Sequence, residues 1–228
     1  MSIETDLLPD PPPAEPLVVA ERWLQEARGR CDQPNPDAMA LATASRDARP
    51  SVRMVLCKEI VADPGYVVFF SNYESRKGSE LEMNPHAAAT LHWDHLQRQV
   101  RIEGIVTRVP EAESDAYFAT RPWQRRIGAW ASAQSRPIAS RAALVATIAD
   151  TAGRFGAPMP GPVDLPDPGL AIPRPPHWGG YRLWAERVEL WVEGFARIHD
   201  RVSYCRTLTA AASGSLLPGP WTSARLQP

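Results

Sequence analysis

The sequence is short of cysteine and has no long apolar run, and each shortage argues against a class of protein. Its three cysteines, Cys31, Cys57 and Cys205, show no CxxC spacing, which argues against a disulfide framework or a zinc knuckle. No run of roughly 18 apolar residues is present, and residues 1–16 show no basic segment followed by an apolar one. We therefore expect a cytoplasmic protein with reduced thiols, no signal peptide and no membrane span.

The sequence also has no excess of positive or of negative charge. The formal net charge is −1, from 25 Lys+Arg and 26 Asp+Glu, so no global field attracts nucleic acid or anionic lipid. A glycine-rich dinucleotide fingerprint and a phosphate-binding P-loop are also absent. Any anion site must therefore be local, and neither a nucleic-acid nor a membrane partner is expected.

Proline is abundant, with 24 residues, about twice the usual share. It clusters at residues 9–16, 158–176 and 218–220, which marks linkers instead of core. We expect a flexible Pro-rich arm over residues 1–16 and a single domain over 17–228 that carries a Pro/Gly-rich loop insertion at 157–176.

The hydrophobic pattern predicts a mainly β fold with flanking helices. Short strand-like segments follow one another at hairpin spacing, which favours an antiparallel barrel or sandwich of six to eight strands. Helices are expected at 17–30, 75–83, 111–119 and 138–155, and strands at 38–45, 51–60, 66–72, 87–94, 98–109, 180–185, 187–194 and 196–205.

Residues 75–83 predict an anion site at the start of a helix. Arg76 and Lys77 fall in the first turn, where the helix dipole already places partial positive charge. An anion would relieve this conflict, and the free N–H groups with a Ser75 or Ser79 hydroxyl could help to bind a phosphate. A solvated basic turn is the alternative.

Two strand-like segments place cations among apolar residues. In residues 51–60, alternation puts Arg53 on one face and Lys58 on the other, which is costly unless each finds a partner, although an edge strand with snorkelling cations fits too. In residues 196–205, alternation puts Arg197, His199 and Arg201 on one face. Two guanidiniums beside an imidazole would depress its basicity unless an anion lay between them, but a structural histidine remains open.

A further segment, residues 121–141, interleaves arginines with Trp123 and Trp130. Such a pattern could stack on single-stranded nucleic acid, but a phosphorylated aromatic small molecule suits the same groups and the net charge better. His92 and His95 have a spacing that invites a metal site. On a strand end this spacing puts the two imidazoles on opposite faces, so no metal site is expected.

In order along the chain, ten motifs resemble those of the pyridoxamine 5′-phosphate oxidase family. The resemblance runs from about Leu17 to Pro228, and ten ordered motifs are far more specific than any single one. The motifs are RMVLCK at 53–58, FSN at 70–72, SRK at 75–77, RQV at 98–100, YFATRP at 117–122, IGAWASAQS at 127–135, WGGYRL at 178–183, ELW at 189–191, RIHDR at 197–201 and RLQP at 225–228.

The resemblance implies an antiparallel, Greek-key type split β-barrel that binds flavin mononucleotide (FMN) at the subunit interface of a homodimer. The FMN contacts that it implies are Arg53, Met54, Val55, Leu56, Cys57, Lys58, Phe70, Ser71, Arg76, Lys77, Gln99, Gln134, Ser135, Trp191 and Arg201. The substrate contacts that it implies are Lys58, Tyr117, Arg121, Arg125, Arg197, Ile198 and His199, with Arg197 and His199 near the reacting carbon.

The activity that it implies is FMN-dependent oxidation of pyridoxamine and pyridoxine 5′-phosphate to pyridoxal 5′-phosphate, with O2 as acceptor and H2O2 as product. Two departures from the family pattern stand out: Arg125 replaces the usual serine, and the arm before the first helix is acidic and proline-rich. The alternatives are a related FMN oxidase acting on another ring system, of the phenazine type, and a non-catalytic flavin- or vitamer-binding protein.

Overall fold

The computed structural model describes residues 7–30, 32–161, 166, 169–211 and 215–228. Cys31, residues 1–6 of the expected arm, and residues 162–165 and 167–168 of the expected insertion lie outside this part. The single domain expected over residues 17–228 stays a prediction, and the residue contacts form two compact units. Unit 1 comprises Met1–Phe69, Met83–Thr107 and Arg182–Pro228, and unit 2 comprises Phe70–Glu82 and Arg108–Tyr181.

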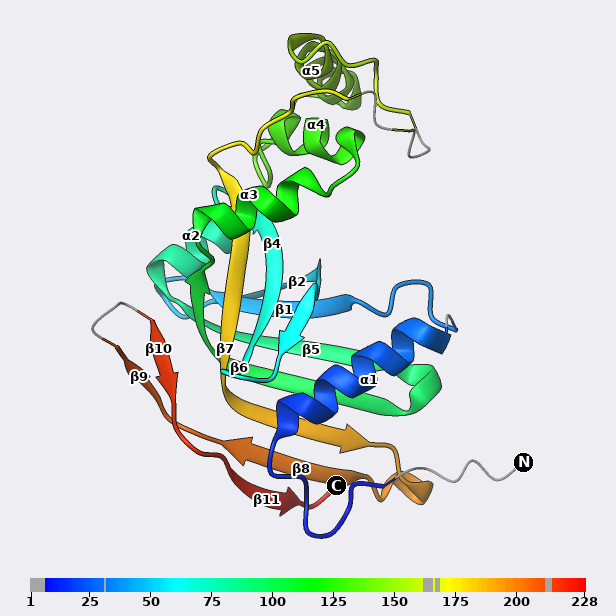
Figure 1. Cartoon of the computed structure of the whole chain (residues 1–228), viewed down its shortest axis with the longest axis vertical. Coiled ribbons are helices and arrows are strands. Elements are labelled where there is room, and N and C mark those ends of the chain that lie inside the picture. Colours follow the sequence, from blue (N-terminus) through cyan, green and yellow to red (C-terminus); the bar gives the residue numbers. More distant parts are fainter. Residues whose placement is uncertain (1–6, 31, 162–165, 167–168, 212–214) are drawn as a thin grey trace. The chain divides into compact units, whose positions relative to one another are not determined.

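A nine-stranded sheet forms the framework, in the order β11-β8-β7-β6-β5-β1-β2, with β4 paired to β3 and β7 (Figure 1). The pairs with a defined register are antiparallel, as the hairpin spacing predicts. The strands are β1 (Ala38–Ala44), β2 (Pro50–Leu56), β3 (Glu59–Val61), β4 (Tyr66–Asn72), β5 (His86–Trp93), β6 (Arg98–Arg108), β7 (Trp178–Val192), β8 (Asp200–Cys205) and β11 (Thr222–Leu226).

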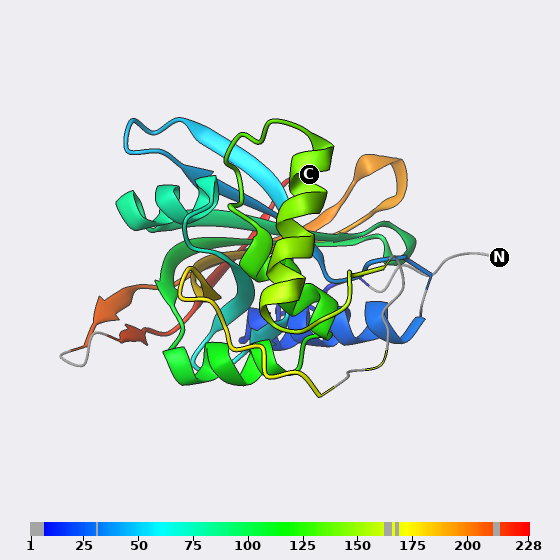
Figure 2. The same ribbon diagram turned by 90° about the horizontal axis from the view of Figure 1, so that it is seen from above.

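A separate two-stranded hairpin, β9 (Leu208–Ala210) with β10 (Leu216–Pro218), lies away from α1 in both ribbon views (Figures 1 and 2). With the terminal strand β11, it lies in a part of the chain for which no strand was predicted. Each of these segments is five residues or fewer, which is too short for an alternating pattern to be distinctive.

Two predicted strand boundaries differ from the structure. The strand expected over 51–60 divides after Leu56, because the Cys57 N–H donates to the Asp37 carbonyl (2.8 Å) and the Lys58 N–H to the Val68 carbonyl (2.8 Å). The chain thereby leaves β1 and joins β4. The strands expected at 180–185 and 187–194 are instead one continuous strand, β7.

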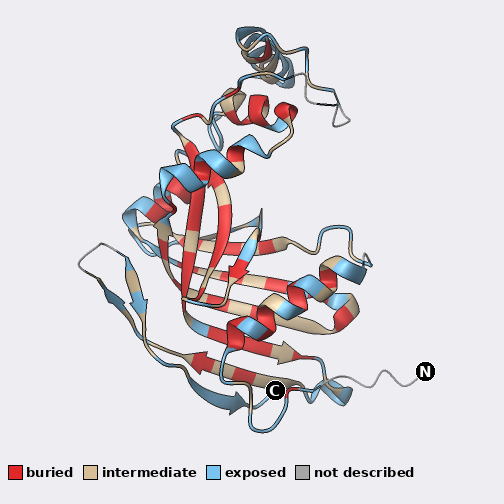
Figure 3. Cartoon of the chain, viewed as in Figure 1, coloured by how far each residue is buried: buried red, intermediate tan, exposed pale blue. Residues whose placement is uncertain are grey.

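The predicted opening helix is α1 (Pro16–Arg30), and it covers the core of unit 1 with its apolar side. Trp23 and Leu24 on that side are almost fully buried. The strands β1, β5 and β6 alternate between buried and partly exposed positions, so one side chain in two enters the same core (Figure 3). No helix in the described part of the chain is long and apolar enough to cross a membrane.

The described part of the expected arm, residues 7–15, contacts β8 and β11. The Leu8 N–H donates to Asp200 Oδ2 (2.7 Å), and the Leu8 side chain is buried. Arg225 Nη2 donates to the Pro9 carbonyl (2.8 Å), while Arg225 Nη1 forms an ion pair with Asp200 Oδ1 (2.5 Å). Asp200 and Arg225 therefore hold residues 8–9 against the sheet of unit 1.

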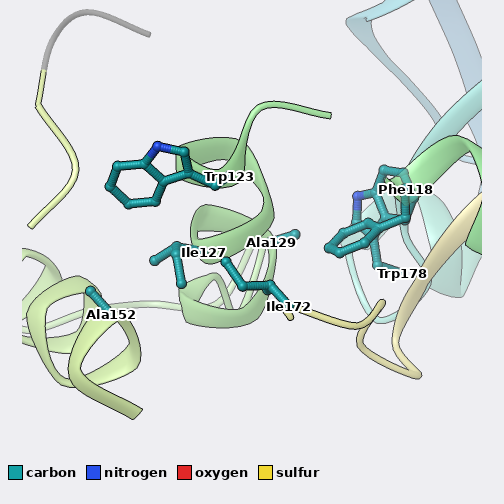
Figure 4. Close-up of a cluster of buried hydrophobic side chains, with 7 residues drawn as sticks. All are labelled: Phe118, Trp123, Ile127, Ala129, Ala152, Ile172 and Trp178. Carbon is teal, nitrogen blue, oxygen red and sulfur yellow. The ribbon is translucent and has the colours of Figure 1, made fainter. Parts of the chain in front are cut away.

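Unit 2 holds four of the helices and a core of its own. Trp123 and Ile127, one turn apart on α4, enter this core, and Phe118 meets Trp178 edge-on with ring centroids 5.1 Å apart (Figure 4). The helices are α2 (Arg76–Met83), α3 (Glu111–Ala119), α4 (Trp123–Ala131) and α5 (Arg141–Arg154), of which α4 was not predicted as a helix.

Candidate functional site

A buried lysine organises the first part of the candidate site, within unit 2. Only 8% of the surface of Lys77 is exposed. Its ammonium group donates to Gln134 Oε1 (2.8 Å), Ser71 Oγ (2.9 Å) and Ser75 Oγ (3.3 Å). Ser71, Lys77 and Gln134, which the resemblance assigned to one flavin site, are therefore in direct contact.

The start of α2 places this lysine. Ser75 Oγ accepts a hydrogen bond from the Gly78 N–H (3.3 Å), which caps the helix, and donates one to the Asn72 carbonyl (2.7 Å). The backbone of Gly78 lies so close to Tyr73 that a Cβ atom would come within 2.0 Å of the Tyr73 carbonyl oxygen. A side chain at position 78 would therefore push α2 away from the loop that precedes it.

The donor set of this region suits a phosphate. An ammonium and two hydroxyls converge at the first turn of α2, where no acidic residue offsets the helix dipole. Arg76 adds a second cation, 64% exposed and paired with Glu80 (2.9 Å). Ser135, beside Gln134, adopts a left-handed backbone with φ 70°. A bound phosphate would relieve the repulsion between the cations and the dipole.

Three aromatic rings form a wall elsewhere in unit 2. Phe70 and Tyr117 are stacked with centroids 3.8 Å apart and planes 15° apart. Trp178 continues the stack, nearly parallel to both rings. The resemblance assigned Phe70 to the flavin and Tyr117 to the substrate, whereas Trp178 was not predicted as a site residue. Its only sequence signal is its place at the start of the WGGYRL motif.

Arg121 lies over this wall with an unfilled hydrogen-bonding position. Its guanidinium carbon is 4.6 Å from the centroid of the Trp178 ring. Nη1 is buried and has no hydrogen-bond partner among the described residues. Burial lowers the pKa of Arg121, and the positive charge of Arg125 acts in the same direction. An anion at Arg121 would satisfy the donor and offset both effects.

Strand β2 carries the second part of the candidate site, within unit 1. Alternation holds along β2 as predicted: Val52 (69%) and Met54 (61%) are strongly exposed, and Arg53 and Val55 are partly buried. β2 ends the strand order and, among the described strands, pairs with β1 alone. Its second edge therefore keeps backbone groups available to the polar rim of a ring system.

The two cations of the RMVLCK motif have different surroundings. Arg53 donates to Thr43 Oγ1 (2.6 Å) and to the Leu41 carbonyl (3.1 Å), so its side chain is bound to β1. Lys58 has its backbone tied to Val68, but its ammonium has no hydrogen bond or ion pair with any described residue. Cys57, between β2 and Lys58, is fully buried, and burial raises the pKa of its thiol to about 12.

The prediction that Arg197, His199 and Arg201 share one strand face is wrong for the first two. β8 begins only at Asp200, and residues 195–197 form a short 3-10 turn in which Ala196 (φ 54°) and Arg197 (φ 65°) are left-handed. A Cβ atom on Gly194 would lie 1.7 Å from the Ile198 carbonyl oxygen, so the turn closes only over glycine. Arg197 and Ile198 are exposed at its tip.

His199 is held in one orientation by this turn. The Gly194 N–H donates to His199 Nδ1 (3.3 Å), and the Trp191 ring lies 4.7 Å away at an angle of 40°. Because Nδ1 accepts this hydrogen bond, the neutral ring carries its proton on Nε2. The structure thus brings Trp191 and His199 together and leaves Nε2 as the donor.

Arg201 is anchored on β8. Its Nε donates to Glu189 Oε1 (2.9 Å) and its Nη1 to the Gln227 carbonyl (2.9 Å). The hydrogen bond to Glu189 raises the pKa of Arg201. Gln99 lies on β6 in register with His92 of β5. Glu189 was not predicted, although it is the acidic residue of the ELW motif. Among the described residues, no group of three His, Cys, Asp or Glu could hold a metal ion.

The chain matches two family descriptions that together cover most of its length. Residues 30–154 match "Pyridoxamine 5′-phosphate oxidase", and residues 178–228 match "Pyridoxine 5′-phosphate oxidase C-terminal dimerisation region". The second match contains β7, the Gly194–His199 turn and β8. It therefore includes the site residues Glu189, Trp191, Arg197, His199 and Arg201.

Curated relatives are similar over nearly the whole chain. A pyridoxine/pyridoxamine 5′-phosphate oxidase of Rhodospirillum rubrum is 45% identical over 217 residues, covering 94% of this chain and 96% of the relative. One from Cupriavidus metallidurans is 44% identical over 225 residues, covering 99% of this chain and 92% of the relative. One from Paracoccus denitrificans is 47% identical over 195 residues, covering 85% of this chain and 82% of the relative.

Two solved structures share the fold. PhzG from Burkholderia lata 383, crystallised with tetrahydrophenazine-1-carboxylic acid, superposes with a TM-score of 0.80 at 31% identity, covering 98% of this chain and 99% of PhzG. A pyridoxamine 5′-phosphate oxidase-related, FMN-binding protein from Nostoc punctiforme superposes with a TM-score of 0.66 at 17% identity, covering 93% of this chain and 98% of that protein. The second likeness concerns the fold alone.

Proposed function

The chain belongs to the pyridoxine/pyridoxamine 5′-phosphate oxidase family, and we propose that it oxidises pyridoxamine and pyridoxine 5′-phosphate to pyridoxal 5′-phosphate. FMN is the cofactor, O2 the electron acceptor and H2O2 the product of its reduction; with the amine substrate, water hydrolyses the imine to the aldehyde and ammonia is released. The names of the curated relatives support the substrate class. The acceptor and the peroxide follow from the family resemblance.

The observation that carries the substrate class is the position of Arg121. A buried guanidinium with an unfilled donor beside a wall of three aromatic rings suits a ligand that joins an anionic group to a flat ring. A phosphorylated pyridine has both features. Tyr117 stands in the same wall, and Lys58 is a cation with no ion pair among the described residues, so both are proposed as further phosphate ligands.

The residues that we propose for FMN suit its two ends. The phosphate would be held by Lys77, Ser71, Gln134 and Arg76 at the start of α2, with Ser135 beside them. The ring would lie along residues 53–58, whose backbone edge and exposed apolar side chains suit a flat polar-rimmed ring, with Phe70, Gln99, Trp191 and Arg201 as further contacts. When bound, FMN supplies the acceptor for a hydride from the C4′ carbon of the substrate.

The residues of the Gly194–His199 turn are proposed to act at the reacting carbon. His199 would present its Nε2–H to the substrate oxygen or nitrogen at C4′, while Arg197, exposed and without an ion pair among the described residues, would lie over the pyridine ring. The positive φ at Arg197 sets the backbone direction of the turn from which its side chain would reach the ring. The turn therefore reduces the entropic cost of aligning the substrate.

A homodimer is proposed as the working form. The C-terminal match is to a dimerisation region, and β2 leaves Val52 and Met54 in water. Exposed apolar side chains in a row are costly, so we propose that the dimer buries them, with the flavin site at the subunit interface.

The decisive experiment is oxygen consumption by FMN-loaded protein given pyridoxine 5′-phosphate, with formation of the aldehyde followed by absorbance. Unphosphorylated pyridoxine is the substrate control, and Arg121→Leu removes the proposed phosphate ligand without adding charge. Turnover that needs both the phosphate and Arg121 supports the proposal. Flavin-loaded protein that binds pyridoxal 5′-phosphate but consumes no oxygen would indicate a binding protein.

A second candidate function has one observation in its favour. PhzG was crystallised with a phenazine carboxylic acid and is 31% identical to this chain. A tricyclic carboxylate also joins an anion to a flat ring, so it could meet the same aromatic wall. Oxygen consumption with a reduced phenazine carboxylic acid, but not with pyridoxine 5′-phosphate, would favour this reading.

A further inference from the structure

One carboxylate of unit 1 joins two arginines that are a hundred residues apart in the sequence. Glu189, on β7, has a side chain that is only 9% exposed, and each of its oxygens has its own arginine. Oε1 accepts from Arg201 Nε and Oε2 from Arg101 Nη1, both at 2.9 Å. Arg101 and Arg201 lie on the strands β6 and β8, to either side of β7. Glu189 is therefore a bridge across three strands.

The bridge leaves one edge of Arg201 available. Glu189 accepts a hydrogen bond from Arg201 Nε, and the Gln227 carbonyl accepts one from Nη1. Nη2 has no partner among the described residues. A guanidinium is planar, so two fixed donors also fix the direction of the third nitrogen. The cavity beside Arg201 has a volume of about 380 Å³ and is lined by Arg101, Glu103, Arg187 and Glu189 among others.

A carboxylate at this place needs an explanation in terms of charge. FMN is an anion, and a buried negative charge beside its proposed ligand Arg201 would weaken binding by Coulomb repulsion alone. Burying a carboxylate is also costly unless it is fully paired. Glu189 is fully paired, and its pairing sets the geometry of Arg201.

We infer that Glu189 is a positioning residue, which holds the Arg201 guanidinium in the orientation that binds FMN. This rests on the proposed role of Arg201 as an FMN ligand. Loss of Glu189 would free Arg201 to rotate about its side-chain bonds, and the ordering of that long side chain would then be paid at the moment of binding.

The test is FMN affinity, measured by quenching of flavin fluorescence when FMN is titrated into the full-length protein stripped of flavin. Glu189→Gln is expected to weaken FMN binding on the order of 10-fold, although it removes a negative charge. A charge effect alone has the opposite sign, since removing the carboxylate would tighten binding of an anion. Glu189→Asp keeps the charge but shortens the side chain, and it is also expected to weaken binding.

Glu103→Gln is the matched control. Glu103 lines the same cavity and pairs with Arg101 (2.9 Å), but it has no hydrogen bond or ion pair with Arg201. Its substitution removes the same charge from the same sheet face and is expected to leave FMN affinity unchanged or slightly higher. Melting temperatures without FMN show whether each variant is folded. If Glu189→Gln does not fold, the FMN affinity of Glu189→Asp tests the inference in its place.

The decisive comparison is a double-mutant cycle between Glu189→Gln and Arg201→Gln. If Glu189 acts through Arg201, then Glu189→Gln causes no further loss of FMN affinity once Arg201 is replaced. Equal losses in both backgrounds, or unchanged binding by Glu189→Gln and Glu189→Asp while Arg201→Gln weakens it, would overturn the inference alone. Unchanged affinity in Arg201→Gln would overturn it together with the proposed role of Arg201.

Discussion

The backbone N–H of Gly194 donates a hydrogen bond to Nδ1 of His199 over 3.3 Å, and this bond decides which ring nitrogen carries the proton. In the neutral imidazole one nitrogen accepts and the other donates, so Nε2 is the donor. The turn that makes this bond closes over Gly194, where a Cβ atom would meet the Ile198 carbonyl. His199 is therefore expected to serve as a hydrogen-bond donor through Nε2.

This expectation separates two conservative substitutions of His199. The amide nitrogen of glutamine reaches the position of Nε2, whereas that of asparagine reaches only the position of Nδ1. His199→Gln is expected to keep kcat/KM for pyridoxine 5′-phosphate within about tenfold of the wild type, and His199→Asn to lose about 100-fold. Steady-state kinetics on both variants measures this, and equal or better activity of His199→Asn would contradict the assignment.

Lys77 is expected to contribute most of the charge that binds the FMN phosphate. Lys77→Met removes charge-assisted hydrogen bonds, each worth about 1.5–3 kcal/mol, so the dissociation constant of FMN should rise on the order of 10- to 100-fold. Flavin fluorescence titration measures it. Arg76→Gln is the neighbouring comparison, and a smaller loss is expected because Arg76 is largely exposed and pairs with Glu80. An unchanged FMN affinity in Lys77→Met would refute the phosphate site.

Arg125, which stands where the family usually has serine, is expected to strengthen binding of the substrate phosphate. Arg125→Ser should raise KM for pyridoxine 5′-phosphate about 5-fold with little change in kcat, and should make KM less dependent on salt. Arg141→Ser, which removes another exposed arginine of unit 2, is the control. A lower KM in Arg125→Ser would mean that Arg125 hinders this substrate and selects another anion.

The Cys57 thiol is expected to be unreactive in the folded protein. Burial raises its pKa to about 12, so almost no thiolate exists at pH 8. With Cys31 and Cys205 replaced by serine, Ellman's reagent at pH 8 should detect no thiol in the native protein and one in denaturant. Rapid reaction of the native protein would show that Cys57 is reachable.

The same pKa shift predicts a pH dependence of stability. The unfolded thiol ionises near pH 9.0 and the folded one near 12, so above pH 9 the unfolded state loses its proton first and the folded state loses relative stability. The loss approaches about 1.4 kcal/mol per pH unit between these values. Urea unfolding at pH 8 and pH 10.5 should show a smaller decline for Cys57→Ala than for the wild type, and equal declines would contradict it.

Local pattern was sufficient where an element makes its own hydrogen bonds. The helix predicted over 111–119 has the bounds of α3, and the helix predicted over 17–30 is α1. Alternation also predicted that successive residues of β2 lie on opposite faces. These features depend on residues within a few positions of one another, so the sequence carries them directly.

Distant contacts decided the elements that were predicted wrongly. The strand expected over 51–60 ends at Leu56 because the next two N–H groups donate hydrogen bonds to the Asp37 and Val68 carbonyls. The strand expected over 196–205 starts late because Ala196 and Arg197 take left-handed conformations that neither residue prefers. Neither change leaves a trace in local periodicity.

The family, the antiparallel class of the sheet and the residue types that could bind a phosphate all follow from the sequence alone. Which of the many cations are buried, and how they are oriented, depends on the folded chain: Gln134, 57 residues away, accepts a hydrogen bond from Lys77, and Glu189 accepts one from Arg201. The physical reason is that burial and hydrogen-bond geometry depend on residues brought together from distant parts of the chain. Charge and local conformation depend on the residue and its neighbours.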